Sequence, residues 1–182
     1  MSRVNVLFFL TGSIACYKAC TALSRLGQAG LAVQTVATPA ALKFIGPATL
    51  EALTGRPVVS DMWEPGRALD HIDLARQADL AIVCPATANT INRLAAGMAD
   101  DLTGSLFLAW ERESKPWWIA PAMNTYMWQH PATQGSVEKL KSWGVRVVEP
   151  EAGLLACGDT GAGRLADPEK IAAEIIKTVK KG

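Results

Sequence analysis

Five short apolar runs recur along the chain, and they constrain its fold more than any other feature of the sequence. They cover residues 4–10, 31–36, 80–84, 117–120 and 145–148. Segments with helix-like spacing of apolar residues separate them, as expected for parallel strands that are buried on both faces and joined by crossover helices. At 182 residues a single compact domain is expected. The pattern therefore predicts a three-layer α/β fold, one domain over residues 1–182, built on a parallel sheet.

Glycine and proline residues set the limits of the predicted helices. Gly30 ends a helix over residues 13–29, and Pro47 opens a short helix that Gly55 ends. Pro168 opens the final helix. Further helices are predicted at about residues 88–96, 101–110 and 133–143. Composition predicts loops at residues 60–70 and about 150–167, and the second loop is expected to be mobile because it holds three glycines within six residues.

Composition excludes several classes of function. The 18 Lys and Arg against 17 Asp and Glu give a net charge of +1, which removes the electrostatic argument for a nucleic-acid partner. Two histidines and four scattered cysteines without a CxxC pair make a poor metal site. No apolar stretch approaches the roughly 20 residues that cross a bilayer. Unpaired cysteines without a signal peptide predict a cytoplasmic setting, with no metal, no membrane and no nucleic acid.

Small polar residues follow the predicted strands, at the edge of the sheet where such folds bind ligands. Gly12 and Ser13 come after the first run, Thr38 after the second, and Thr87 after the third. Ser13 lies where a helix begins, so it either helps to bind a phosphate through free backbone N–H groups or only caps the helix. Thr87 either caps the helix that follows it or belongs to a run of small polar residues that offers donors to the edge of a planar ligand.

Three further residues are candidates for chemistry, each with a structural alternative. His71 stands between Asp70 and Asp73, where it is either a base or a surface histidine. Asn124 lies in a segment rich in Met and aromatic residues, so it either contacts a ligand beside an apolar wall or caps a helix whose aromatic residues enter the core. Cys157 begins the glycine-rich loop and is either a proton donor or nucleophile on a closing flap, or an incidental thiol.

Four motifs follow one another in this order along the chain. They are His-Ile-Asp-Leu at residues 71–74, Pro-Ala-Thr-Ala-Asn-Thr at 85–90, Pro-Ala-Met-Asn-Thr-Tyr-Met-Trp at 121–128, and Ala-Cys-Gly-Asp-Thr-Gly-Ala-Gly-Arg-Leu at 156–165. Together with Gly12-Ser13-Ile14-Ala15, the set resembles the flavin-containing cysteine decarboxylases, in the branch that acts in coenzyme A biosynthesis. The resemblance extends from Gly12 to Pro168 and implies a Rossmann-like (flavodoxin-like) sheet.

The resemblance implies an FMN-dependent carboxy-lyase that converts 4'-phosphopantothenoylcysteine to 4'-phosphopantetheine. In that family the thiol-bearing carbon is transiently oxidised to a thioaldehyde, which accepts the electrons left by the departing CO2. The resulting enethiolate is then reduced by reduced FMN, so that no net redox change occurs.

The resemblance also assigns roles to individual residues. His71 corresponds to the base or positioner of the substrate thiol and carboxylate, Asn124 to the residue that binds the carboxylate and amide region, and Cys157 to the proton donor on the closing loop. The implied FMN-binding residues are Gly12, Ser13, Ile14, Thr38, Phe44, Thr87, Ala88, Asn89, Thr90 and Ala122. The implied substrate-binding residues are Met123, Asn124, Ala156, Cys157 and Gly158.

Partners and alternatives follow from the same resemblance. The family forms homo-oligomers, trimers or dodecamers, with sites at subunit interfaces, and in many bacteria the decarboxylase is fused to a phosphopantothenate–cysteine ligase. The chain ends at Gly182, so we expect either a stand-alone enzyme or one half of a bifunctional protein. The alternatives are a flavin-binding regulatory subunit of a partner phosphatase and an oxidative peptidyl-cysteine decarboxylase, the latter disfavoured because such enzymes lack the loop cysteine.

Overall fold

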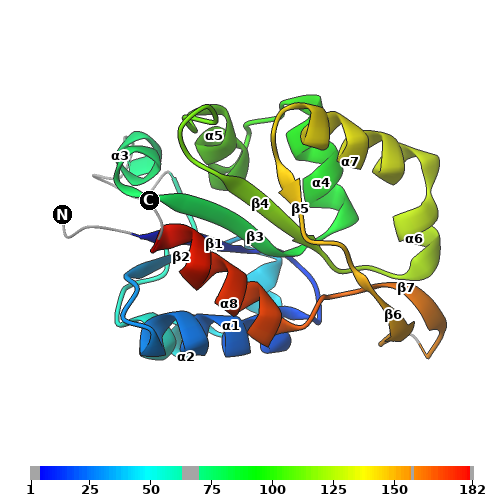
Figure 1. Cartoon of the computed structure of the whole chain (residues 1–182), viewed down its shortest axis with the longest axis horizontal. Helices are drawn as coiled ribbons and strands as arrows, with labels where there is room; N and C mark the ends of the chain where they lie inside the picture. The colour runs from blue at the N-terminus through cyan, green and yellow to red at the C-terminus, as the bar shows by residue number, and fades with distance from the viewer. Residues whose placement is uncertain (1–4, 63–69, 157, 181–182) are drawn as a thin grey trace.

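The computed structural model describes residues 5–62, 70–156 and 158–180, and its centre is a sheet of five parallel strands (Figure 1). The strands are β1 Val6–Leu10, β2 Val33–Ala37, β3 Leu80–Ala86, β4 Trp117–Pro121 and β5 Arg146–Val147. Their order across the sheet is β2-β1-β3-β4-β5. This is the flavodoxin-like order, in which the loops after β1 and β3 diverge at the topological switch point and leave a crevice for a ligand.

Helices cover both faces of the sheet and make the three layers that the sequence predicts (Figure 1). One face carries α1 Cys16–Gln28, α2 Pro47–Thr54 and α8 Pro168–Val179. The other carries α3 Asp70–Gln77, α4 Ala88–Ala96, α5 Leu102–Leu108 and α7 Pro131–Ser142. The remaining elements are the 3-10 turn η1 Ala41–Lys43, the short helix α6 Thr125–Gln129, and the hairpin strands β6 Glu151–Leu154 and β7 Thr160–Arg164.

Successive residues of β1 enter two different cores, because side chains alternate across a strand. Phe8 packs with residues of α1 and α8, whereas Phe9 packs with residues of α4 and α5. In the second core the ring of Trp117 lies 5.1 Å from that of Phe9 and 5.0 Å from that of Phe107, measured between centroids. Burial on both faces explains why the strand sequences are continuously apolar.

The five predicted strands and the six predicted helices are confirmed, with strand ends within two residues of the predicted ones. Two strands inside an expected loop are new, because the segment 150–167 contains the antiparallel hairpin of β6 and β7. The expected loop at residues 60–70 ends where α3 begins at Asp70, and residues 63–69 lie outside the described chain. No helix among the described residues has both the length and the apolar character to cross a bilayer.

Two helical glycines give a matched test of the packing. A Cβ at Gly104, in α5, would overlap the carbonyl oxygen of Met98, whereas a Cβ at Gly135, in α7, would meet nothing within 4 Å. We expect Gly104→Ala to lower the free energy of unfolding by about 1–3 kcal/mol through overpacking. Gly135→Ala should raise it by about 0.5–1 kcal/mol, since alanine is the better helix former. Urea denaturation measures both, and a shift of the two variants in the same direction would contradict this packing.

Candidate active site

A cavity of about 390 Å³ opens at the carboxyl edge of the sheet, between the start of α1, the segment after β4 and the β6–β7 hairpin. Its lining residues come from these three segments only. They are Ser13, Ile14, Ala15, Tyr17, Lys18, Ala122, Met123, Asn124, Leu154, Leu155, Ala156, Gly163, Arg164 and Leu165. The cavity therefore joins residues predicted to bind FMN with residues predicted to bind substrate.

Backbone contacts confirm that the segments after the strands converge. The hydroxyl of Thr11 donates to the carbonyl oxygen of Pro85 at 2.6 Å and accepts from the backbone N–H of Thr87 at 3.1 Å. The N–H of Ala122 donates to the carbonyl oxygen of Ala86 at 3.0 Å. These bonds tie the ends of β1, β3 and β4 into one edge, as the strand pattern predicts.

The start of α1 fits a phosphate group. The backbone N–H groups of Gly12 and Ile14 donate to no acceptor among the described residues, and they lie at the positive end of the helix dipole. A Cβ at Gly12 would lie 2.7 Å from that of Ala40, so only glycine allows the loops after β1 and β2 to come this close. The hydroxyl of Ser13 accepts from the N–H of Ala15 at 3.2 Å, so it also stabilises the turn that leads into the helix. Both interpretations of Ser13 are compatible with this geometry.

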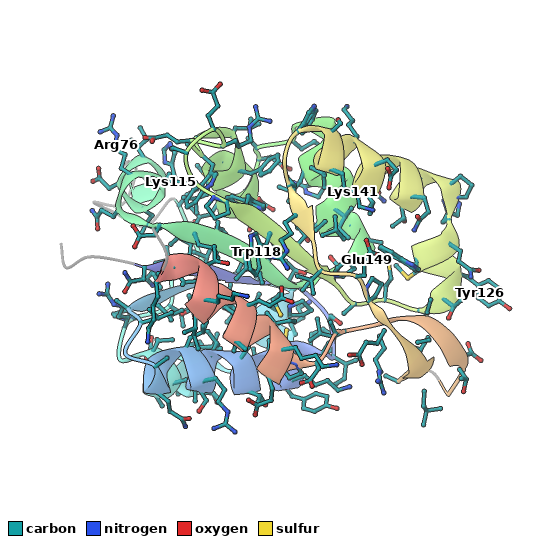
Figure 2. All side chains as sticks on the ribbon, in the orientation of Figure 1. Arg76, Lys115, Trp118, Tyr126, Lys141 and Glu149 are labelled. Carbon is teal, nitrogen blue, oxygen red and sulfur yellow. The ribbon has the colours of Figure 1, made fainter. Side chains whose placement is uncertain are left out.

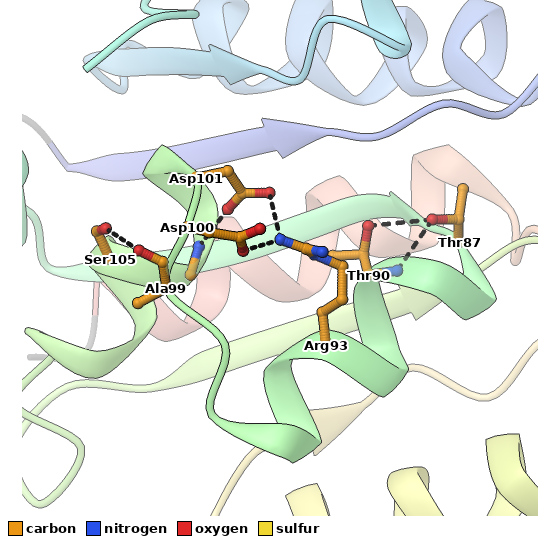
Figure 3. A network of polar contacts seen from close by, with 8 residues as sticks. Thr87, Thr90, Arg93, Ala99, Asp100, Asp101 and Ser105 are labelled. Atoms are coloured by element: carbon orange, nitrogen blue, oxygen red, sulfur yellow. Dashed lines mark hydrogen bonds and ion pairs between the residues drawn. The ribbon is translucent and has the colours of Figure 1, made fainter. Parts of the chain in front are cut away.

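The residues after β3 have a structural role in α4. Thr87 is its N-cap, and the Thr87 hydroxyl accepts from the N–H of Thr90 at 3.3 Å. At the other end of α4, Arg93 pairs with Asp100 and Asp101, which fixes the start of α5 (Figure 3). The predicted cap is thus confirmed, whereas flavin binding by Thr87, Ala88, Asn89 and Thr90 stays a prediction, since none of the four lines the cavity.

The two predicted FMN residues after β2 also lie outside the cavity lining. The Thr38 hydroxyl accepts from the N–H of Ala41, the first residue of η1, at 3.2 Å. Phe44 follows η1 and its side chain is 48% exposed. An exposed aromatic ring beside the carboxyl edge leaves a surface for a planar ligand, so its contact with the flavin stays a prediction.

Asn124 is oriented toward the cavity by its capping bond. Its Oδ1 accepts from the N–H of Met127 at 2.8 Å at the start of α6, which confirms the predicted N-cap. Its Nδ2 donates to no acceptor among the described residues, so two N–H donors are available to a bound carboxylate. The neighbouring aromatic wall is absent from the lining: Tyr126 is 79% exposed and points outward at the edge of the molecule (Figure 2), and only Met123 faces the cavity.

The hairpin lies directly against the segment that carries Asn124. The N–H of Met123 donates to the carbonyl oxygen of Gly163 at 2.9 Å, and the Thr125 hydroxyl donates to that of Ala162 at 2.9 Å. A Cβ at Gly161 would overlap Thr125, and one at Gly163 would overlap the carbonyl oxygen of Met123. The glycines of the fourth motif therefore allow close backbone approach. Ala156 lines the cavity, Gly158 does not, and Cys157 lies outside the described residues.

His71 is not brought to the cavity within one chain. It lies in the first turn of α3, at the end of the molecule opposite to α6 and the hairpin (Figure 1). Lys115 donates from Nζ to the carbonyl oxygens of Ala75 at 3.1 Å and Arg76 at 2.7 Å, which fixes the C-terminal end of α3 (Figure 2). The Nδ1 atom of His71 is buried and finds no hydrogen-bond partner among the described residues. Such an atom is normally paired in a complete environment.

The three cysteines among the described residues are unsuited to act as reactive thiolates. Burial raises the pKa of the thiols of Cys16, Cys20 and Cys84, most strongly for the fully buried Cys84. Because the thiolate is the reactive form, all three stay protonated near neutral pH. The described residues also contain no group of three or more side chains suited to a metal ion.

Several lining residues were missed by the sequence analysis. Tyr17 and Lys18 lie in the first turn of α1, directly after the predicted ligand segment at residues 12–14, and this closeness in the chain was the available signal. Arg164 and Leu154 belong to the hairpin, whose contacts no local pattern indicates. The Arg164 guanidinium donates to the Glu151 carboxylate at 2.7 Å and holds the pKa of that carboxyl below its usual range.

Residues 1–180 match the Flavoprotein family. The chain belongs to this family. It is 45% identical over 173 residues to the coenzyme A biosynthesis bifunctional protein CoaBC of Bacillus subtilis, covering 94% of this chain and 42% of that protein. The chain thus spans about two fifths of the length of the bifunctional relatives. It is also 42% identical over 173 residues to the "Probable phosphopantothenoylcysteine decarboxylase" of Streptococcus mutans, covering 94% of this chain and 96% of that protein.

Solved structures of this flavoprotein family share the fold. A mutant of PPC decarboxylase complexed with pantothenoylaminoethenethiol matches with a TM-score of 0.86 at 30% identity, over 100% of both chains. The FMN binding protein AtHal3 matches with a TM-score of 0.84 at 29% identity, over 100% of this chain and 99% of that one. The predicted fold class and the predicted family resemblance are confirmed.

The close approach of the hairpin to the Asn124 segment gives a direct test. Gly163 has a φ of +119° and no room for a Cβ, so Gly163→Ala should detach β7 from Met123. We expect amide hydrogen exchange over residues 151–164 to accelerate by at least about tenfold, while the exchange of β1 and β3 stays unchanged. Gly46→Ala is the control, because a Cβ there meets nothing within 4 Å. Unchanged exchange in the hairpin of Gly163→Ala would show that this packing is wrong.

Proposed function

We propose that this flavoprotein is an FMN-dependent decarboxylase that converts 4'-phosphopantothenoylcysteine to 4'-phosphopantetheine in coenzyme A biosynthesis. One observation carries the proposal: the Asn124 amide, whose Nδ2 has no acceptor among the described residues, faces a cavity whose described lining contains two cations and no carboxylate. A substrate with a carboxylate and a phosphate complements such a cavity. The relative from Streptococcus mutans, matched over 96% of its length, supports this choice of substrate.

The residues around the carboxyl edge fit FMN. The N–H groups of Gly12 and Ile14, which donate to no acceptor in the described part of the chain, suit its phosphate, and the exposed Phe44 ring suits its planar ring system. The family match and the FMN binding protein AtHal3 support the same cofactor. When bound, FMN supplies reversible acceptance of electrons, which makes loss of CO2 from an otherwise unactivated carbon feasible.

The side chains of this protein would bind the substrate, orient it and supply a proton to it. Asn124 Nδ2 would hold the substrate carboxylate, and Ser13, Ile14 and Ala122 would separate the flavin side of the cavity from solvent. His71 would position the thiol and carboxylate or accept the thiol proton. Cys157, which follows the lining residue Ala156, would donate the final proton. The inert thiols of Cys16, Cys20 and Cys84 support giving that role to the fourth cysteine.

The site would be completed by a second copy of the chain. His71 in α3 and Asn124 at the start of α6 lie at opposite ends of one molecule (Figure 1). The Nδ1 of His71 has no hydrogen-bond partner among the described residues, which supports an environment completed by another subunit. When one end of a chain contacts the other end of the next, the interface is heterologous, and a suitable rotation closes it into a ring. This supports the trimer, alone or within a dodecamer, that the family resemblance implies. We further propose a cytoplasmic enzyme that works with a phosphopantothenate–cysteine ligase, as the bifunctional relatives support.

The first test is a flavin spectrum followed by turnover. We expect the purified protein to be yellow, with the absorbance of bound FMN, and to release CO2 from phosphopantothenoylcysteine while forming phosphopantetheine. Mass spectrometry of the product separates this reaction from oxidative decarboxylation, which would stop at the enethiol. A colourless protein that takes up no flavin on soaking would refute the proposal.

A second test mixes subunits. We expect His71→Asn and Asn124→Asp each to keep flavin but to lose turnover by about 100-fold or more, since a carboxylate at position 124 repels that of the substrate. Co-expression of the two variants should restore about one quarter of wild-type turnover, because one site in four of a random mixture receives both intact residues from different chains. Mixtures that stay inactive, with flavin bound and the oligomer intact, would show that one chain supplies both residues.

A further inference from the structure

Lys115 closes the C-terminal end of α3. Its Nζ donates to the carbonyl oxygen of Ala75 at 3.1 Å and to that of Arg76 at 2.7 Å (Figure 2). In a longer helix these oxygens would accept from the N–H groups of residues 79 and 80, four positions later. Both of those groups donate instead to the carbonyl oxygen of Asn5, where the chain joins the sheet. Lys115 therefore supplies the hydrogen bonds that the turn into β3 takes away from α3.

Lys115 is itself held in place ahead of β4. Its N–H donates to the carbonyl oxygen of Glu111 at 3.0 Å, and its own carbonyl oxygen accepts from the indole Nε1 of Trp110 at 2.9 Å. The ammonium group also lies 5.7 Å from the centre of the Trp110 ring, at the distance of a cation–π contact. Trp110 is buried in the second core. The residue that holds α3 is thus anchored to the core of the protein.

The apolar contacts of α3 set the face that it presents to the core. Leu74 and Ala75 are buried there, and His71 lies one turn before them on the same side of the helix. Apolar contacts are non-directional, so they oppose rotation of this face away from the core more than a slide along the helix axis. A helix of eight residues is also too short to be stable by itself. The directional bonds from Lys115 therefore set the axial position of α3.

We propose that Lys115 is a positioning residue for His71, an assignment that rests on the proposed function. Lys115 does not line the cavity, so it acts through α3, which transmits a displacement of its last turn to its first turn. The Nδ1 of His71 has no hydrogen-bond partner among the described residues that would correct such a displacement. Misplacement of a reacting group by about 1 Å costs about 100-fold in rate.

The first test is kinetic and uses the holoenzyme. Lys115→Met keeps the length of the side chain but donates no hydrogen bond. We expect kcat for phosphopantothenoylcysteine to fall by about 10-fold to 100-fold, while KM and the affinity for FMN change by less than about threefold. Lys115→Arg keeps a cation with several N–H donors and should recover most of the lost rate. Lys115→Gln, whose amide still donates to one carbonyl oxygen, should lie between them and replaces Lys115→Met if that variant does not fold.

Lys139→Met is the matched control. The exposed Lys139 lies on α7 with its Nζ 5.1 Å from the centre of the Trp143 ring, so this variant removes the same charge and a similar cation–π contact. It should leave kcat, KM and flavin affinity unchanged. An equal loss of kcat in Lys139→Met and Lys115→Met would be a general effect of charge and would overturn the proposal.

Mixed oligomers separate the positioning of His71 from general damage. Lys115→Met co-expressed with Asn124→Asp should restore about one quarter of wild-type turnover, because one site in four combines unaltered His71 and Asn124 sides from different chains. Co-expression with His71→Asn should restore nothing, because both variants damage the same side of the site. Restoration by His71→Asn would overturn the proposal. So would failure of Asn124→Asp to restore turnover to Lys115→Met where it does restore turnover to His71→Asn.

A measurement without turnover keeps this proposal distinct from the proposed function. The chain has two histidines, so NMR of protein with carbon-13-labelled histidine follows the His71 imidazole, with His71→Asn as the assignment standard. Lys115→Met should shift the His71 signal, leave that of His130 in place, and accelerate amide hydrogen exchange in α3 by at least about tenfold. Lys139→Met should change none of these. If the wild type binds flavin but releases no CO2, the proposed function fails, whereas an unchanged His71 signal in Lys115→Met overturns the positioning role in either case.

Discussion

The burial of β1 and β3 on both faces is the constraint on which the rest of this structure depends. Every residue of these two strands is buried, so no polar side chain for chemistry fits within them. Polar groups are therefore confined to the ends of the strands, and the parallel arrangement brings the carboxyl ends to one edge. Thr11 then joins the loops after β1 and β3 through hydrogen bonds to Pro85 and Thr87. The site lies where it does because the sheet leaves no other place for it.

The same constraint explains how much of the fold the sequence predicts. Strands buried on both faces are continuous apolar runs, a local signal, and their predicted ends fall within two residues of those observed. Helix limits are also local, since Gly55 and Gly97 adopt the positive φ of C-terminal caps. Asn124 and Thr87 were correctly predicted as N-caps for the same reason. In both cases a cap does not exclude a ligand contact, because one polar atom forms the cap while another stays available.

The features that the sequence does not predict depend on contacts between distant segments. The β6–β7 hairpin has little apolar alternation of its own, and its place is set by Met123 and Thr125, more than 35 residues earlier in the chain. In the sequence nothing separates Lys18 from an ordinary surface lysine, because the cavity that it lines exists only once the hairpin forms the other side. The distance of His71 from Asn124 is likewise a property of the assembled sheet, since motif order along a chain carries no information about which end of a molecule each motif reaches.

The contacts of the hairpin with the rest of the chain also restrict how it can move. The Thr125 hydroxyl donates to Ala162 and the N–H of Met123 donates to Gly163, so a displacement of the whole segment 150–167 would break both bonds, whereas the Glu151–Arg164 ion pair lies within the segment. Within the tip, the N–H of Leu155 donates to the carbonyl oxygen of Asp159, and the N–H of Gly158 donates to that of Leu155. Leu155 and Ala156 line the cavity. Because Asn124 follows Met123 directly in the chain, the bond between Met123 and Gly163 couples the position of the hairpin to that of the Asn124 carboxamide. The proposed carboxylate-binding side of the cavity and the hairpin are therefore fixed relative to each other.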